Sequence, residues 1–189
     1  VKRDTPLMVL IGNPPYANFG QMNQGEWIKG LIADYKKDLN EKKINLDDDY
    51  IKFIRYGQYC IEKNGEGILA YISNNSFIDG ITHRQMRRSL LEAFDKIYVL
   101  DLHGSTKKRE VCKDGSKDEN VFDILPGVSI NIFIKQKQKN SSIKLAEVYH
   151  CDILGLRKEK YKILSKERIK TIGFEKILLH EPYSFFVPH

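Results

Sequence analysis

Four short apolar runs, with two amphipathic helical segments between the first three, most restrict how this chain can fold. The runs cover residues 6–12, 66–73, 96–102 and 127–136. The first three are almost continuously apolar, which is typical of strands covered on both faces, as in parallel α/β sheets. The pattern therefore predicts an α/β fold whose first three strands are parallel and joined by crossover helices.

The two crossover helices are predicted over residues 47–62 and 82–94, where apolar side chains recur at helical spacing. Thr82 and Gln85 have the spacing of a capping box at the start of the second helix. The fourth apolar run instead follows a polar segment, residues 103–122, that contains no helical pattern. Without a crossover helix, the last strand is predicted to be antiparallel to its neighbour.

The composition indicates a soluble globular protein, because 41% of the 189 residues are hydrophobic and 30% are charged. No apolar run approaches the roughly 20 residues that a membrane span needs, so we expect no membrane contact. Three scattered cysteines, Cys60, Cys112 and Cys151, argue against a disulfide framework and predict a reducing, cytoplasmic location. His150 adjoins Cys151, but no second pair lies at zinc-site spacing, so no metal site is predicted.

The segment Asn13-Pro14-Pro15-Tyr16 directly follows the first apolar run. Two adjacent prolines fix two φ angles and remove two backbone donors, so this turn is stiff. It lies where open α/β sheets bind ligands, after the carboxyl end of a strand. Asn13 and the Pro14 carbonyl can direct two acceptors at one amino group, and Tyr16 offers a flat ring for stacking. The segment therefore predicts a site for a planar aromatic amine, with a rigid, purely structural turn as the alternative.

The "NPPY" segment resembles the fourth motif of amino-directed methyltransferases that use S-adenosylmethionine, in which Asp, Asn or Ser precedes Pro-Pro and an aromatic residue. Three further stretches resemble the elements that follow in large bacterial adenine DNA methyltransferases. They are "AYISNNSFIDG" (70–80), "RQMRRSLLEAFDKIYVLDLHG" (84–104) and "NVFDILPGVSINIFIK" (120–135). The likeness is greatest to the methyltransferase module of single-polypeptide restriction–modification enzymes and covers residues 6–138.

The resemblance implies a partial Rossmann-like class I methyltransferase sheet, its C-terminal half, with an antiparallel last strand. Residues 1–138 would be the second half of the catalytic domain. Residues 139–189 would be a linker and the start of a target-recognition region, since "KQKQKNSS" marks a change in composition and a basic stretch follows. The implied reaction is methyl transfer from S-adenosylmethionine to the N6 amino group of adenine in double-stranded DNA. Asn13, Pro14 and Tyr16 would be catalytic, and Pro15 would line the pocket of the flipped base. Asn74 and Asn75, at the carboxyl end of the second strand, either line that pocket or satisfy backbone groups of their own turn.

The family's cofactor motifs are not found in this sequence. The only Gly-x-Gly, Gly65 to Gly67, precedes a strand instead of following one, which indicates a turn. We therefore expect the strands that hold S-adenosylmethionine to lie upstream in a longer parent polypeptide, and we expect the isolated chain to be inactive. Two alternatives stay open, namely a related methyltransferase acting on RNA or protein glutamine, and a non-catalytic DNA-binding module.

The net charge of +6 permits contact with DNA phosphates but does not require it. Two basic groups are candidates for such contacts, although a solvated surface is the favoured interpretation of each: Arg84, Arg87 and Arg88 on the second helix, and Lys107, Lys108 and Arg109 in the polar loop. Residues 17–46 are predicted to be a long loop. Its Trp27 either covers the base or anchors the loop.

Overall fold

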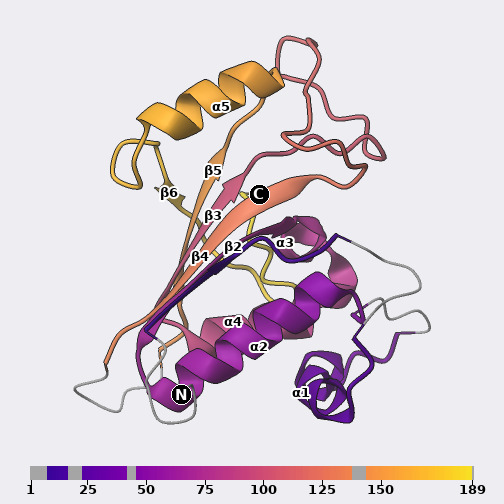
Figure 1. The fold of residues 1–189 in the computed structure, drawn as a ribbon, viewed down its shortest axis with the longest axis vertical. Helices are drawn as coiled ribbons and strands as arrows, with labels where there is room; N and C mark the ends of the chain where they lie inside the picture. Colours follow the sequence, from indigo (N-terminus) through magenta and orange to yellow (C-terminus); the bar gives the residue numbers. More distant parts are fainter. Residues whose placement is uncertain (1–7, 17–22, 42–45, 138–143, 189) are drawn as a thin grey trace.

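A six-stranded mixed sheet with helices on both faces forms the fold in the computed structural model (Figure 1). The structure describes residues 8–16, 23–41, 46–137 and 144–188. The strands are β1 (Val9–Gly12), β2 (Gly67–Asn74), β3 (Lys96–Asp101), β4 (Val128–Lys135), β5 (Glu147–Asp152) and β6 (Glu175–Lys176). The helices are α1 (Glu26–Lys36), α2 (Asp49–Asn64), α3 (Ser76–Asp79), α4 (Arg84–Ala93) and α5 (Arg157–Lys166), with a 3₁₀ turn at Ile81–His83.

The strand order β1-β2-β4-β3-β5-β6 places the last predicted strand inside the sheet. β1 pairs with β2 in parallel, and β3 pairs with β5 in parallel. β4 lies between β2 and β3 and is antiparallel to both. The predicted partial class I methyltransferase sheet with an antiparallel last strand is therefore confirmed, and its crossovers α2 and α4 join β1, β2 and β3 as expected.

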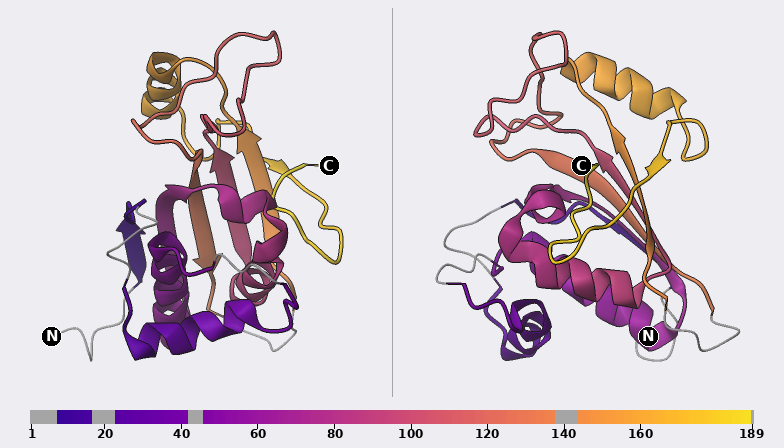
Figure 2. Two further views of the ribbon diagram at one scale, coloured as in Figure 1. Left: turned by 90° about the vertical axis from the view of Figure 1, so that its right-hand side faces the viewer. Right: turned by 180° about the vertical axis from the view of Figure 1, so that it is seen from behind.

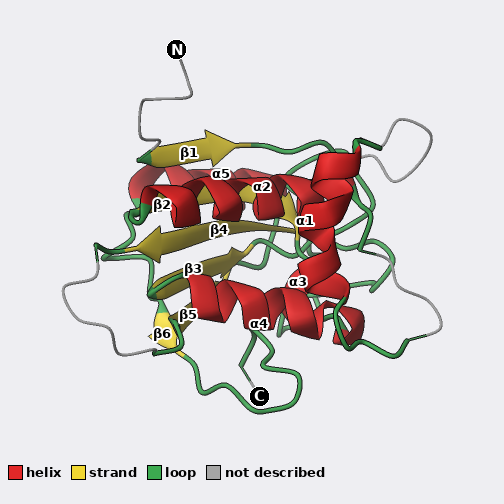
Figure 3. Ribbon diagram, turned by 90° about the horizontal axis from the view of Figure 1, so that it is seen from below, coloured by secondary structure: helices red, strands yellow, loops and turns green. Residues whose placement is uncertain are grey.

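The helices are divided between the two faces of the sheet (Figures 2 and 3). α1, α2 and α4 cover one face, where the larger apolar core contains Ile54, Leu69 and Phe133. α5 lies against the other face, where a smaller core forms around Leu100, Leu102 and Val128. Alternate residues of β3 enter the two cores, as the two-residue period of a strand requires. In the described part of the chain, no helix is long and apolar enough to cross a membrane.

The predictions were wrong in two local details. The predicted long loop contains α1, whose buried Ile28, Ile32 and Tyr35 follow the helical period. The capping box at Thr82 and Gln85 does not form. The 3₁₀ turn occupies residues 81–83, so α4 begins only after His83, without a side-chain cap.

The predicted domain boundary at residue 138 lies outside the described residues. Beyond it, β5 and β6 extend the same sheet, and the C-terminal segment returns along α4 (Figure 2). Phe186 is fully buried in the larger core, and its ring centroid lies 6.4 Å from that of Phe77. The outer side of α5 stays exposed, with Lys158, Lys162 and Lys166 in solvent. Target recognition by residues 139–189 stays a prediction.

Arg87 was expected to contact DNA phosphates, and the structure contradicts this. Its side chain is completely buried and donates hydrogen bonds to the carbonyl oxygens of Phe77, Gly80, Tyr183 and Ser184 at 2.7–3.1 Å. Burial lowers the pKa of the Arg87 guanidinium to about 10. Arg87 therefore ties the C-terminal segment to α3 and α4, and phosphates cannot reach it.

Replacing Arg87 should destabilise the protein far more than replacing its neighbour Arg88. Arg87→Met leaves two buried and two partly buried carbonyl groups without donors, and each buried group costs about 1–3 kcal/mol. Arg88 is paired with Glu92 and Glu181 at the surface, where ion pairs contribute at most about 1 kcal/mol. We expect a loss of more than about 3 kcal/mol for Arg87→Met and less than about 1 kcal/mol for Arg88→Met, measured by urea denaturation. Equal losses would contradict the structural role of Arg87.

Candidate functional site

The carboxyl ends of four strands meet at one edge of the sheet. β1, β2, β3 and β5 all point toward this edge, and β4 begins there. The register places Asn74 opposite Val128, and Asp101 opposite both Ser129 and Asp152. Polar side chains that are far apart in the sequence are thus brought into one row, next to the loop that carries "NPPY".

The "NPPY" segment leaves the end of β1 with alternating exposure. Asn13 and Pro15 are exposed, Pro14 is buried and Tyr16 is half-buried. The preceding Gly12 lies so close to β2 that a Cβ atom there would be 2.9 Å from the ring of Tyr71. The buried proline and this close approach hold the turn, and the amide of Asn13 stays accessible to a ligand.

Tyr16 is held on two sides. Its hydroxyl donates a weak hydrogen bond of 3.4 Å to the carbonyl oxygen of Ile72 on β2. Its ring lies 5.9 Å, centroid to centroid, from that of Phe122 in a tilted arrangement. Burial raises the pKa of the Tyr16 hydroxyl to about 12, so the hydroxyl is neutral at physiological pH.

Asn74 and Asn75 have different surroundings, although both were predicted to line the base pocket. The Asn74 side-chain oxygen accepts hydrogen bonds from the backbone N–H and the hydroxyl of Ser76, at 2.8 and 2.7 Å. Asn74 thus closes its own turn. The buried Asn75 side chain donates a 2.9 Å hydrogen bond to a carboxylate oxygen of Asp101, which links the ends of β2 and β3. Their contact with a base stays a prediction.

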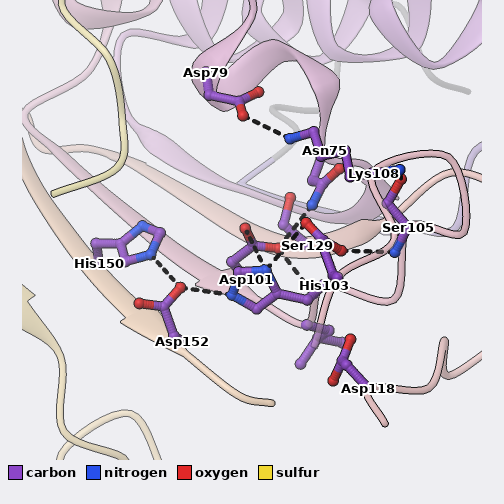
Figure 4. Close-up of polar contacts among 12 residues, drawn as sticks. Asn75, Asp79, Asp101, His103, Ser105, Lys108, Asp118, Ser129, His150 and Asp152 are labelled. Carbon is purple, nitrogen blue, oxygen red and sulfur yellow. Dashed lines mark hydrogen bonds and ion pairs between the residues drawn. The ribbon is translucent and has the colours of Figure 1, made fainter. Parts of the chain in front are cut away.

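An ionic cluster lies next to this link, around His103 (Figure 4). His103 Nε2 donates a 2.8 Å hydrogen bond to Asp152 Oδ1, and His150 Nε2 lies 2.9 Å from the same oxygen. His103 Nδ1 lies 3.5 Å from Glu110 Oε1 and 3.7 Å from Asp101 Oδ2. The sequence analysis missed this cluster, because its members come from β3, from the loop between β3 and β4, and from β5, and they form no motif.

The cluster shifts the pKa values of its members. Burial alone lowers the pKa of His103, but hydrogen bonds to Asp152 and Glu110 and the nearby Asp101 charge outweigh it, raising that pKa to about 10. Hydrogen bonds from His103 and His150 hold the pKa of Asp152 far below its usual range. Burial raises the pKa of Asp101, an effect that the positive charge of His103 opposes. At neutral pH His103 is therefore a cation held by surrounding carboxylates.

Asp101, His103 and Asp152 also have the side chains of a metal site, with ligand-type atoms all within 4.8 Å of one another. An imidazole binds a metal only in its neutral form. Because the pKa of His103 is about 10, binding a cation would require displacing a proton that two carboxylates hold. We therefore interpret the cluster as an ionic link between strand ends.

The predicted phosphate contacts are only partly available. Arg84 pairs with Glu41 at 2.8 Å and donates to the Leu39 carbonyl oxygen, and Lys108 pairs with Asp79 at 2.6 Å. Arg88 has the acidic partners described above. Lys107 and Arg109 are exposed, and no ion pair involves either of them in the described part of the chain. Of the six basic candidates, Lys107 and Arg109 are therefore the most accessible to a phosphate group.

Trp27 packs edge-on against Tyr56 and Tyr59 of α2, with ring centroids 5.9 and 5.3 Å away. It is 54% exposed and lines a cavity of about 320 Å³ between α1 and α2. These contacts favour the anchoring role for Trp27, because they attach α1 to the crossover helix α2.

The charge on His103 makes the stability of the protein depend on pH. The pKa of a histidine is about 6.5 in the unfolded chain and about 10 for His103 in the folded protein. The stabilisation is therefore complete below pH ~6.5 and is lost as the pH rises toward 10, by at most about 1.4 kcal/mol per pH unit. We expect His103→Gln to flatten this decline in the free energy of unfolding, measured in urea from pH 6.5 to 10.

The exposed His180 offers a matched control, because His180→Gln should leave the decline unchanged. An equally steep decline in His103→Gln and in the unmodified protein would contradict the ionic role of His103.

Several solved structures resemble this chain, including the following three. The DrdV–DNA complex has a TM-score of 0.78 and 27% identity over 93% of this chain. The ATP-dependent Type ISP restriction-modification enzyme LlaBIII bound to DNA has a TM-score of 0.78 and 29% identity over 96%. A nuclease-deletion mutant of the Type ISP enzyme LlaGI, in complex with a DNA substrate mimic, has a TM-score of 0.76 and 28% identity over 93%.

This chain spans only 18%, 13% and 17% of those three chains, respectively. No curated protein matches it. The family model of the Eco57I restriction-modification methylase matches residues 8–107, which is more than half of the chain and includes the "NPPY" turn, β2 and β3. The chain therefore belongs to the Eco57I restriction-modification methylase family.

Proposed function

We propose that this chain is the base-binding half of a DNA methyltransferase that methylates the N6 amino group of adenine. The observation that carries the proposal is the "NPPY" turn at the carboxyl edge of the sheet. There the Asn13 side chain is exposed while Pro14 is buried. A rigid turn that presents an exposed amide at a ligand-binding edge fits recognition of an amino group.

The adenine amino group is a poor nucleophile, because its lone pair is delocalised into the ring. Asn13 Oδ1 and the Pro14 carbonyl oxygen would each accept a hydrogen bond from this amino group. The two hydrogen bonds would favour a pyramidal nitrogen with a localised lone pair. Preorganised polar groups of this kind act by positioning and by charge complementarity. The reaction needs no covalent intermediate with the enzyme.

The base has to leave the duplex stack to reach this turn. Tyr16 would stack on the flipped adenine, with the orientation of its ring already set by Ile72 and Phe122. Pro15 is exposed beside it and would line the same pocket. Stacking of a base on an aromatic side chain contributes about 1–3 kcal/mol.

S-adenosylmethionine would supply the methyl group. Gly65 ends α2 in a left-handed conformation and donates its N–H to the carbonyl oxygens of Ile61 and Glu62, so the Gly65–Gly67 turn does not fit a cofactor loop. We propose that the parent polypeptide binds most of the cofactor with strands that extend the sheet beyond β1, which is its outer strand among the described residues. At that edge Val9 and Ile11 are 53% and 80% exposed.

Duplex DNA is the proposed substrate. The three similar structures hold DNA or a DNA substrate mimic, which supports DNA over RNA or a protein glutamine. The test is to incubate the full-length polypeptide with cofactor carrying a labelled methyl group and with duplex DNA, RNA or protein. Label on N6 of adenine supports the proposal. Label only on RNA or protein, or no transfer at all, would overturn it.

Asn13 should control the rate of the chemical step. Loss of one preorganised polar contact to the reacting group typically lowers turnover by about 10²–10³-fold. We expect this loss for Asn13→Ala in the full-length enzyme, with little change in DNA affinity, because phosphate contacts dominate affinity. Asn13→Asp keeps an acceptor and should retain more activity than Asn13→Ala. If Asn13→Ala methylates as fast as the parent, the turn is only structural.

Tyr16 should determine how tightly the flipped base is bound. Tyr16→Ala removes the stacking face and should weaken binding of the flipped base by about 1–3 kcal/mol. Tyr16→Phe loses only the 3.4 Å hydrogen bond to Ile72 and should be nearly silent. Fluorescence of 2-aminopurine at the target position reports flipping directly. A phenylalanine variant as defective as the alanine variant would show that the hydroxyl, and not the ring, is required.

A further inference from the structure

Three lysines form a row on the outer side of α5. Lys158, Lys162 and Lys166 are all exposed and follow one another at intervals of four residues. In an α-helix this spacing places them on one side, about 6 Å apart along the axis. In the described part of the chain, no acidic side chain pairs with any of them. We call Lys158, Lys162 and Lys166 the lysine row.

This distribution of charge does not favour the helix itself. Arg157 and Lys158 occupy the first turn of α5, where the helix dipole favours acidic residues. Like charges four residues apart also repel each other. The one acidic residue within α5, Glu159, accepts the backbone N–H of Leu156 at 3.2 Å and does not balance the row. The helix dipole favours only Lys166, in the last turn, so helix stability does not explain Lys158 and Lys162.

A buried ion pair fixes the orientation of α5. Lys160 Nζ lies 2.7 Å from Asp118 Oδ1, and both side chains are fully buried. Lys160 Nζ also donates to the carbonyl oxygens of Leu102 and Glu119 at 2.6 and 2.7 Å. Three acceptors thus satisfy this ammonium group and fix how α5 is rotated about its axis. In this orientation the lysine row is exposed to solvent.

The first turn of α5, which carries Lys158, lies beside the candidate site. Leu102, to which Lys160 donates, directly follows β3 at the carboxyl edge of the sheet, and from there α5 runs back over one face of the sheet (Figure 1). Lys158 and the exposed Arg109 both line an open cavity of about 850 Å³ between α5 and the polar loop. Arg157 and Lys117 line it too, but Asp123 and Glu119 pair with them at 2.7 and 3.0 Å. The charge of Arg109 thus lies beside Lys158, at the start of the row.

We propose that the lysine row binds the phosphate backbone of duplex DNA and positions the duplex over the "NPPY" turn. This inference deepens the proposed function and rests on it for the identity of the partner. A straight row of evenly spaced cations matches a backbone of evenly spaced anions. Such contacts fix the position of a duplex without reading its sequence. Binding to RNA or to an anionic membrane is a different outcome that the test separates.

The test replaces Lys158, Lys162 and Lys166 together by Gln in the full-length polypeptide. Each phosphate contact contributes about 0.9 to the slope of log affinity against log salt concentration, so three contacts contribute about 2.7. We expect DNA affinity to fall about 10²-fold near physiological salt and the slope to decrease by about 2–3, measured by fluorescence anisotropy with duplexes of unrelated sequence. The thermal unfolding temperature should not change, because the three side chains are exposed.

A matched control replaces Lys29, Lys37 and Lys63 by Gln. These are exposed lysines on or next to α1 and α2, which cover the opposite face of the sheet (Figure 3). The control removes the same charge and should leave affinity nearly unchanged. Equal losses in both triple variants would overturn the proposal, because they would report net charge alone. Loss of binding to RNA or to phosphatidylserine vesicles, with duplex binding intact, would also overturn it.

Methylation assays separate this inference from the proposed function. At saturating DNA, the lysine-row variant should methylate at the parent rate, with a higher KM for DNA. If the parent methylates no adenine but the variant still loses duplex affinity, the proposed function fails and the phosphate contact stands. If adenine is methylated but the variant binds duplex DNA like the parent, only the lysine row is wrong.

Discussion

The pairing of β4 with both β2 and β3 is the constraint on which the rest of the structure depends. β4 enters the sheet antiparallel between two parallel strands and pairs along the full length of each. Its register aligns Asn74 and Asp101 at one edge. Because β1 and β5 pair in parallel with β2 and β3, the ends of all four strands reach the same edge. The loops that carry chemistry are therefore gathered there.

Different forces hold the two halves of this edge. At β1, two prolines and the close approach of Gly12 to Tyr71 make the turn rigid, and the Asn13 side chain is exposed. At β3 and β5, Asp101, His103 and Asp152 hold the strand ends together by charge. A rigid edge with an exposed amide at one end fits the proposed recognition of a base.

The lysines of α5 have two different roles, since one is buried and anchors the helix and the others are exposed. One lysine, Lys160, is fully buried against Asp118, and a buried pair of this kind repays its desolvation only when its hydrogen bonds are complete. Lys160 has three acceptors, whereas Asp118 Oδ2 has no hydrogen-bond partner among the described residues. The pair therefore contributes more to the orientation of the helix than to stability, and a fixed orientation suits the proposed phosphate contacts.

Local patterns in the sequence were enough to predict much of this protein. Apolar runs and helical spacing predicted β1 to β4, α2 and α4, and the two prolines predicted a stiff turn after β1. Only the tertiary structure decided the roles of identical residue types. Arg87 and Arg88 are adjacent, yet only Arg87 is buried, because residues 183 and 184 fold back onto it from far along the chain. His103 and Asp152 meet because β3 pairs with β5, which no local spacing encodes. Burial and charge pairing are set by neighbours in space, so they could not be predicted from the sequence by itself.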